Sequence, residues 1–256
     1  MESRTAAIVI VGNEVLSGKV EDANSPFLCR ELRALGVSVE RILTLPDVVD
    51  IIAAEVPPLA ARYDWVFSAG GIGPTHDDVT IEGISRGFGV RVLLQEELAR
   101  LLREHYGARL TPAHLKMASI PAGAHLVGGP ALAFPVVAFR NVYIFPGIPT
   151  ILRQKFAAIR EAFRQAPFHL ATLQVNLDEG LLAGHLDALL GQFPGLLVGS
   201  YPQVPPVDCQ VKVTLESKDP ALLAAAQQAL RQKLPAGALV GETASPVSPA
   251  SPPGRP

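Results

Sequence analysis

The first 165 residues alternate short apolar runs with segments of helical periodicity, and this alternation restricts the chain to a few architectures. Apolar runs over 6–12, 37–45 and 63–71 are predicted to be strands, with helical patterns near 25–35 and 48–63 between them. Strands that are separated by helices usually pair in parallel. The first part of the chain is therefore predicted to be an α/β domain, with a mainly parallel sheet between two layers of helices.

Two prolines interrupt the second helical pattern. Pro57 and Pro58 cannot donate a backbone hydrogen bond, so we expect the helix over 48–63 to kink or to restart. We expect the first helix to begin at Ser25, with Pro26 in its first turn. The remaining elements predicted for this domain, which covers 1–166, are helices after Thr80, at about 95–106 and from Thr150, and strands near 136–145.

The pattern changes after about residue 167. The predicted order is a strand (171–176), a helix (179–190), two strands (196–201 and 209–216), a helix (219–232) and a strand (237–240). This order is that of a ferredoxin-like, split βαβ module, which we place at 167–243. Residues 244–256 are rich in Pro and Ser, and we expect a disordered tail there because little apolar surface offsets the cost of ordering it.

Composition argues against several classes of partner. A net charge of -2 and an absence of basic runs give no field that would hold a nucleic acid. The apolar stretches are shorter than the ~20 residues that a membrane-spanning helix needs, and the N-terminus lacks a signal-peptide cleavage pattern. We therefore expect a cytoplasmic protein without a membrane partner. Cys29 and Cys209 are too few for a disulfide framework or a cysteine metal site.

A glycine-rich turn, GGIGPTHDDVT at 70–80, follows the third predicted strand and precedes a helix. Gly70, Gly71 and Gly73 would let backbone N–H groups surround an anion, and the helix would add the positive end of its dipole. Open α/β sheets bind ligands at such turns. Glycine is also common in turns that serve structure alone, and that alternative stays open.

Two adjacent carboxylates, Asp77 and Asp78, lie inside this turn. They would repel a phosphate unless a divalent cation such as Mg²⁺, Mn²⁺ or Co²⁺ were bound between them, which indicates a metal site. For one of the two we expect a plainer role, as a helix cap or a solvated side chain. His76 is predicted to bond a ligand or to be an exposed turn residue, since no partner at a matching spacing suggests a metal ligand.

Two other loops follow predicted strands and are expected at the same edge of the sheet. Asp47 follows the second strand, and the loop over 12–25 contributes Glu14, Ser17, Gly18, Asp22 and Asn24. Either Asp22 or Asn24 could instead cap the helix that begins at Ser25. The chain has no GxxxxGK[ST] loop and no G-x-S-x-G elbow, which argues against the common nucleotide triphosphatases and α/β hydrolases.

The series GNEVLSG, DANS, GGIGPTHDDVT, KMASIPAGA and FPGIP resembles the MoaB/Mog molybdopterin-binding-like domain, in the form found in competence/damage-inducible protein A (CinA) and in eukaryotic-type FAD synthases. The resemblance covers most of 5–165, and VGSYP with CQVKVTL extends it into the second module. The stretch GGPALAFP (128–135) departs from the TAPG-type pattern of many CinA sequences. Because the chain ends where those proteins continue, we expect neither the amidase activity of CinA nor the adenylyltransferase activity of FAD synthase.

This resemblance implies a divalent-metal-dependent pyrophosphatase that splits ADP-ribose, and also FAD or related dinucleotides, with Mg²⁺ or Co²⁺ and with K⁺ assisting in some relatives. The alternatives are a molybdopterin- or nucleotide-binding protein that does not hydrolyse its ligand, and a binding or assembly module without catalysis. It also implies self-association as a dimer or trimer. The phosphate loop that it implies consists of Gly70, Gly71, Gly73, Pro74 and Thr75. The acidic residues that it implies for catalysis and metal binding are Asp47 and Asp78, with Asp77 and Glu14 as supporting candidates. A second loop with Gly147 and Pro149 is expected to border the site, and Asn24 is expected beside the ligand.

Overall fold

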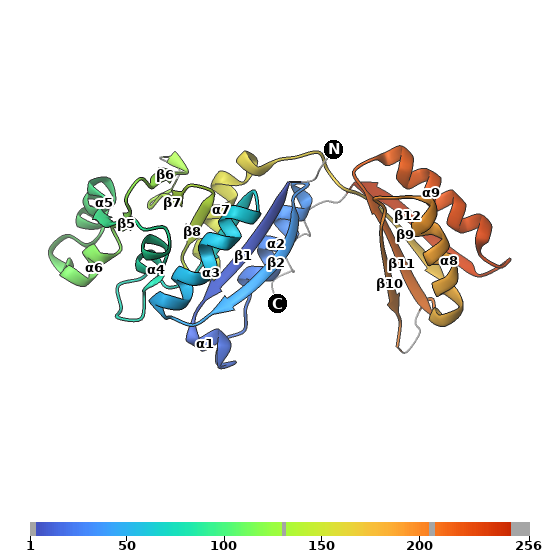
Figure 1. Ribbon diagram of the computed structural model, residues 1–256, viewed down its shortest axis with the longest axis horizontal. Helices are drawn as coiled ribbons and strands as arrows, with labels where there is room; N and C mark the ends of the chain where they lie inside the picture. Colours follow the sequence, from blue (N-terminus) through green and yellow to red (C-terminus); the bar gives the residue numbers. More distant parts are fainter. Residues whose placement is uncertain (1–3, 130–131, 205–207, 247–256) are drawn as a thin grey trace. The chain divides into compact units, whose positions relative to one another are not determined.

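The computed structural model describes residues 4–129, 132–204 and 208–246. It divides into two compact units, Met1–Gln165 and Ala166–Pro256 (Figure 1). The division falls one residue before the boundary expected from the change in sequence pattern. The first unit has two hydrophobic cores, one on each face of its sheet, and the second unit has one, so each unit is described by itself.

A six-stranded sheet forms the centre of the first unit, in the order β2-β1-β3-β8-β7-β6. Four neighbouring strands pair in parallel: β2 (Ser38–Leu45), β1 (Thr5–Val11), β3 (Trp65–Ala69) and β8 (Val142–Phe145). The last two, β7 (Val136–Phe139) and β6 (His125–Val127), pair antiparallel. The predicted mainly parallel α/β sheet is confirmed.

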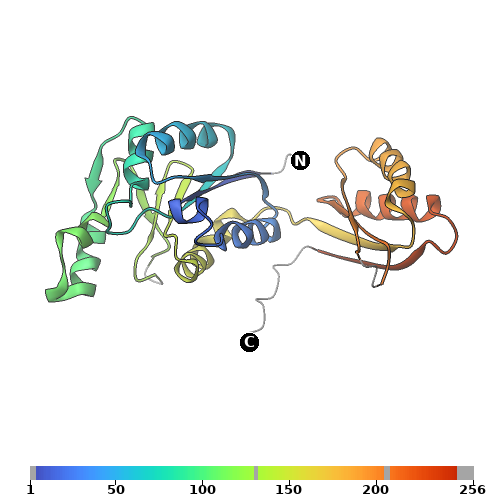
Figure 2. The same cartoon turned by 90° about the horizontal axis from the view of Figure 1, so that it is seen from below.

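Helices cover both faces of this sheet. One core packs α2 (Asn24–Ala34) and α7 (Pro149–Ile159) against it, and the other packs α3 (Val49–Arg62), α4 (Thr80–Gly87) and α5 (Glu96–Tyr106). Figure 2 shows α3 above the sheet, with α2 and α7 below it. The three layers are therefore as predicted. No helix in the described ranges is long and apolar enough to cross a membrane.

Several short elements were not predicted. They are α1 (Asn13–Leu16), β4 (Val92–Leu94), η1 (Gly107–Arg109), α6 (Pro112–Lys116), β5 (Ser119–Pro121) and η3 (Arg160–Phe163). β4 and β5 pair with each other in a separate two-stranded sheet. With three residues per strand, these segments are too short for a repeating apolar pattern to reveal them.

Helix α3 is one continuous element from Val49 to Arg62 with both prolines inside it, so the predicted restart is wrong. Pro57 deprives the carbonyl oxygen of Ala53 of its helical partner. The backbone of α4 covers that oxygen, since a Cβ added at Gly87 would lie 2.4 Å from it. One turn earlier, a Cβ at Gly83 would lie 2.6 Å from the Cβ of Ile52. The absence of a side chain at the two glycines therefore lets α4 pack closely against the middle of α3.

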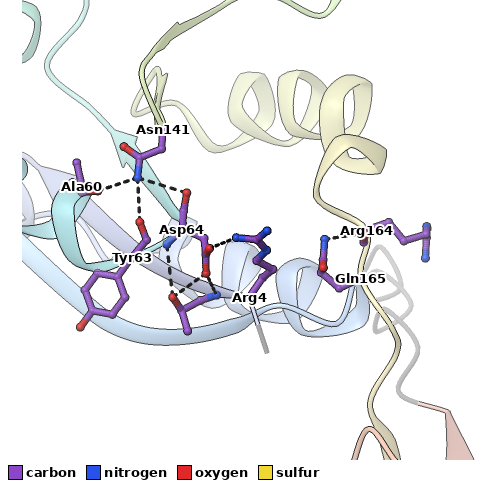
Figure 3. Close-up of polar contacts among 8 residues, drawn as sticks. Arg4, Ala60, Tyr63, Asp64, Asn141, Arg164 and Gln165 are labelled. Carbon is purple, nitrogen blue, oxygen red and sulfur yellow. Dashed lines mark hydrogen bonds and ion pairs between the residues drawn. The ribbon is translucent and has the colours of Figure 1, made fainter. Parts of the chain in front are cut away.

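The end of α3 is fastened to the hairpin between β7 and β8 (Figure 3). Nδ2 of Asn141 lies 2.9 Å from the carbonyl oxygens of both Ala60 and Tyr63. Next along the chain, Asp64 accepts a 2.8 Å hydrogen bond from the backbone N–H of Thr5. That bond is the main reason why the pKa of the Asp64 carboxyl is lowered. These contacts fix where β1 and β3 begin.

The second unit has the ferredoxin-like arrangement that was predicted. Its order is β9 (His169–Val175), α8 (Glu179–Gln192), β10 (Leu197–Pro202), β11 (Val211–Ser217), α9 (Pro220–Lys233) and β12 (Leu239–Pro246). The strands form an antiparallel sheet in the order β10-β11-β9-β12. Both helices contribute to a single core with this sheet, and Figure 1 shows α8 and α9 beside its strands.

The boundary predicted for the tail needs correction. Ala244, Ser245 and Pro246 belong to β12 and pair with Ala171, Leu170 and His169 of β9. Backbone pairing orders these residues although their side chains give no apolar pattern. The second unit therefore extends beyond residue 243, and the rest of the expected tail, 247–256, lies outside the described residues.

The close packing of α4 on α3 predicts that Gly83→Ala lowers the free energy of unfolding by about 1–3 kcal/mol, because overpacking outweighs the better helix propensity of Ala. Chemical denaturation measures the change. Gly184→Ala in α8 is a matched control, since nothing lies within 4 Å of the added Cβ, and it should raise stability by about 0.5–1 kcal/mol. A Gly83→Ala protein as stable as the unaltered one would contradict this description of the interface.

Candidate functional site

The four parallel strands end at one edge of the sheet, and the loops that leave them are joined by backbone hydrogen bonds. The N–H of Gly12, after β1, donates to the carbonyl oxygen of Leu45 at the end of β2 (3.0 Å). The N–H of Gly70, after β3, donates to the carbonyl oxygen of Phe145 at the end of β8 (3.1 Å). The predicted meeting of these loops at one edge is therefore observed.

Gly70 lies where no larger residue fits. A Cβ on it would stand 2.1 Å from the carbonyl oxygen of Val11, and its φ of +107° is unfavourable for other residues. A Cβ at Gly147, in the loop after β8, would lie 3.3 Å from the Cα of Gly70. The predicted phosphate loop and the predicted second loop thus meet through two glycine backbones.

The turn after β3 is attached to the first residue of α4. The Thr80 hydroxyl donates to the carbonyl oxygen of Gly70 at 2.9 Å, and the Thr80 N–H donates to that of Gly71 at 3.0 Å. Between these anchors, the N–H groups of Gly71, Ile72 and Gly73 have no acceptor among the described residues. Three successive free N–H groups, in a turn that Thr80 ties to the first residue of a helix, are the kind of backbone arrangement that binds anions.

The side chain of Asp78 holds the second half of the turn by two hydrogen bonds from Thr75. Its Oδ2 accepts hydrogen bonds from the backbone N–H of Thr75 (2.8 Å) and from the Thr75 hydroxyl (2.6 Å). Thr75, predicted to bind phosphate, thus uses both of its donors on Asp78, and Pro74 has no N–H to offer. The ammonium group of Lys116, on α6, donates to the carbonyl oxygen of Thr75.

Asp77 and His76 are exposed residues of this turn. The side chain of His76 is 98% exposed and stands 4.0 Å from Asp77, as expected for an exposed turn residue. The pKa of Asp77 is lowered, first by hydrogen bonding from the Thr75 hydroxyl and further by its own backbone N–H, His76 and Lys116. Thr75 has one hydroxyl hydrogen for two carboxylates, and its 2.6 Å contact favours Asp78. Asp78 is therefore the carboxylate that the fold holds in place.

A pocket of about 380 Å³ opens beside this turn. Gly73 and Asp78 line it from the turn, Glu82 from α4 and Lys116 from α6. Glu82 and Lys116 were not among the predicted site residues. Lys116 could have been found, because it opens the stretch KMASIPAGA that contributes to the family resemblance.

A second, smaller pocket of about 60 Å³ gathers Glu14, Asn24, Gly147 and Pro149. Nδ2 of Asn24 donates to the carbonyl oxygen of Gly147 at 2.8 Å, while its Oδ1 is buried without a hydrogen-bond partner. Helix α2 begins at Asn24, one residue before the expected start, and its N-cap residue is Ala23, which makes no side-chain cap hydrogen bond. The carboxylate of Asp22, one residue earlier, accepts through Oδ1 from the N–H groups of Asn24 and Ser25. The capping alternative thus holds for Asp22 in that its side chain bonds the first N–H groups of the helix, and Asn24 lines the pocket instead.

Asp47 has a separate local role. Its Oδ2 accepts a 2.7 Å hydrogen bond from the backbone N–H of Asn13, at the start of α1. Asp47 follows β2 and Asp78 follows β3, and these strands lie on opposite sides of β1, roughly 10 Å apart. Across the described ranges, no three His, Cys, Asp or Glu side chains lie close enough together to hold a metal ion.

The last two residues of the segment that departs from the CinA pattern, Phe134 and Pro135, are held to α7. Lys155 donates hydrogen bonds to the carbonyl oxygens of Phe134 (2.6 Å) and Pro135 (2.9 Å). Burial lowers the pKa of this lysine to about 8, because the charged form loses solvation. Lys155 is thus a structural anchor for the end of the 128–135 stretch.

Comparison with known proteins agrees with this architecture. Residues 7–165 match the family described as "Probable molybdopterin binding domain", and residues 167–243 match the "FAD synthase, middle domain". A protein of Archaeoglobus fulgidus is 34% identical over 200 residues, which cover 77% of this chain and 85% of that protein.

A "Probable FAD synthase" of Caenorhabditis elegans is 30% identical over 261 residues, which cover 91% of this chain but only 50% of that protein. The chain thus spans half the length of that relative. The crystal structure of the protein CinA, of unknown function, from Thermoplasma acidophilum is 30% identical with a TM-score of 0.58, and the match covers 63% of this chain and 100% of that one.

The resemblance drawn from the motifs is confirmed by these matches. The chain belongs to the family that carries the probable molybdopterin binding domain, and that domain is followed here by a module of the FAD synthase middle-domain type.

Proposed function

We propose that the first unit binds the pyrophosphate of a nucleotide and hydrolyses it with the help of a divalent metal ion. ADP-ribose is the expected substrate, and FAD or a related dinucleotide is a further candidate. The observation that carries the proposal is the run of free N–H groups at Gly71, Ile72 and Gly73, beside a pocket that Asp78 and Lys116 line. The relatives named FAD synthases support a nucleotide as the ligand.

The turn and Lys116 supply the groups that a phosphate needs. Free backbone N–H groups donate to phosphate oxygens, and the N-terminus of α4 adds a partial positive charge behind them. Lys116 is the only Lys or Arg that lines the pocket within the described part of the chain. Its ammonium group offsets one of the two carboxylates, Asp78 and Glu82, and a bound divalent cation would supply the further positive charge that an anionic ligand needs.

Asp78 is suited to share a divalent cation with such a ligand. Thr75 occupies Oδ2, and Oδ1 accepts no hydrogen bond from the described residues. Because no three-ligand cluster is present in those residues, the ion would be held by one or two carboxylates together with ligand phosphates, as Mg²⁺ commonly is. Asp47 remains the predicted second carboxylate. A bound Mg²⁺ or Co²⁺ would polarise the phosphorus and help to activate water, and K⁺ remains an expected auxiliary ion.

The family match also favours a second candidate, a molybdopterin- or nucleotide-binding protein that leaves its ligand intact. Incubation with ADP-ribose, FAD and NAD⁺ in the presence of Mg²⁺ or Co²⁺, followed by identification of the products, separates the two. Release of AMP from ADP-ribose, or of FMN from FAD, supports hydrolysis. Tight binding without products would support a protein that binds its ligand and leaves it intact. An absence of binding would favour the remaining alternative, an assembly module without a ligand.

The position of Asp78 predicts that Asp78→Asn lowers the turnover of ADP-ribose on the order of 10²-fold, roughly 3 kcal/mol, because the cation loses a charged ligand. Asn can still accept the Thr75 hydrogen bonds, so the melting temperature should not change. Steady-state hydrolysis across a metal titration measures both turnover and metal affinity.

The matched control is Asp77→Asn, because Asp77 is exposed and does not line the pocket. It should keep near-normal turnover, whereas Asp47→Asn should reduce turnover if Asp47 is the second ligand. Near-normal turnover and an unchanged metal requirement in Asp78→Asn would remove this residue from the mechanism.

Lys116→Gln should raise the KM for ADP-ribose about tenfold, since a hydrogen bond to a charged group contributes roughly 1.5 kcal/mol. The effect should shrink at high salt, where the charge is screened. Lys212→Gln, an equivalent change at an exposed position of β11 in the second unit, is the control and should leave KM unaltered. An equal KM in both variants would show that Lys116 does not contact the phosphates.

A further inference from the structure

The pocket beside the phosphate turn has an apolar side that phosphate binding leaves unexplained. Five of its ten lining residues are apolar: Ile72, Ile81, Val92, Met117 and Val137. Val92 belongs to the three-residue strand β4, where it is 41% exposed. An open apolar wall next to ionised side chains is the usual composition of a small-molecule site, where a flat ring covers the wall and polar groups fix its orientation.

The ionised groups restrict which ring edge can enter. Apart from Lys116, which is bonded to Thr75, the charged lining groups are the carboxylates of Asp78 and Glu82. Ionised carboxylates accept hydrogen bonds and cannot donate them. A ring edge that carries an amino group complements them, whereas an edge of carbonyl oxygens is repelled. Adenine carries such an amine, whereas the outer edge of a flavin ring carries two carbonyl oxygens on either side of a single N–H, so that two of its three polar groups face the carboxylates unfavourably.

The size of the pocket restricts how much of a ligand it can hold. About 380 Å³ lies at the small end of the ~300–1,000 Å³ typical of ligand pockets. The neighbouring pocket of about 60 Å³, around Asn24 and Gly147, is too small for an aromatic ring. Space for one ring system is therefore present beside the turn.

We propose that this pocket binds the amino-bearing ring of one nucleotide half, stacked on the wall that includes Val92 and Met117, and that a dinucleotide is held through that half alone. This inference rests on the proposed function for the position of the phosphates. It assigns Val92 and Glu82 as residues that determine ligand specificity.

The test compares three ligands that share a ribose 5-phosphate group: AMP, IMP and ribose 5-phosphate itself. IMP differs from AMP by a carbonyl oxygen in place of the exocyclic amine and by a hydrogen on the neighbouring ring nitrogen, so it keeps one donor where AMP has an NH₂ group. Calorimetric titration at a fixed Mg²⁺ concentration should give AMP an affinity at least about tenfold higher than that of ribose 5-phosphate. IMP should bind more weakly than AMP, and Glu82→Gln should reduce this difference, because an amide can donate as well as accept.

β4 offers a matched pair of variants. Val92 lines the pocket and Leu93 does not, although they are adjacent and similarly exposed, at 41% and 44%. Successive strand residues point to opposite faces. Val92→Ser should weaken AMP binding roughly fivefold and leave ribose 5-phosphate unchanged, whereas Leu93→Ser should alter neither. Melting temperatures confirm that both variants fold.

Equal affinities of AMP and ribose 5-phosphate, an absence of AMP binding, or equal effects of the two serine variants would overturn the ring site. ADP-ribose hydrolysis is measured separately on the same proteins. AMP-selective binding without hydrolysis would refute the proposed reaction and keep the ring site. Hydrolysis without a preference for AMP would keep the reaction and refute the ring site.

Discussion

The parallel pairing of β1 with β2 on one side and β3 on the other is the constraint on which the first unit depends. The residues from Ala6 to Val11 are almost entirely withdrawn from water, and they alternate between two separate cores. A strand buried on both faces needs a layer of helices on each face. Because the neighbouring strands run in the same direction, their carboxyl ends lie at one edge of the sheet. The glycine-rich turn over 70–80, the loop that contains α1 and the loop at Gly147 meet at that edge.

The chemistry at that edge is governed by a shortage of positive charge. Two carboxylates, Asp78 and Glu82, and one ammonium group, Lys116, line the pocket beside the free N–H groups. An anionic ligand entering there needs a further cation, and this need connects the proposed metal ion to the proposed substrate. Lys116 also bonds to Thr75, which in turn holds Asp78. A change in the position of α6 would therefore also move Thr75 and alter the position of the Asp78 carboxylate.

The elements that could be predicted from the sequence are those in which the spacing of apolar residues indicates the buried face of a helix or strand. β1, α2 and the whole order of the second unit belong to this class, as does the glycine turn, because its backbone geometry requires glycine. The pocket wall could not be predicted, since β4 and β5 are short and Val92 remains exposed. The contact between Lys116 and Thr75 could not be predicted either, because these residues are 41 positions apart and only the tertiary fold brings them together. The pairing of Ala244 in β12 was missed for a related reason, since backbone hydrogen bonds leave no side-chain signature.

The crowding at Gly70 has a consequence for the cost of binding. Its Cα lies between the carbonyl oxygen of Val11 and the backbone of Gly147. In addition, Thr80 donates hydrogen bonds to the carbonyl oxygens of Gly70 and Gly71. The loop that would receive the phosphates therefore loses its conformational entropy when the protein folds, before any ligand arrives. Binding to such a preorganised loop keeps more of the interaction free energy as affinity, because little ordering remains to be done.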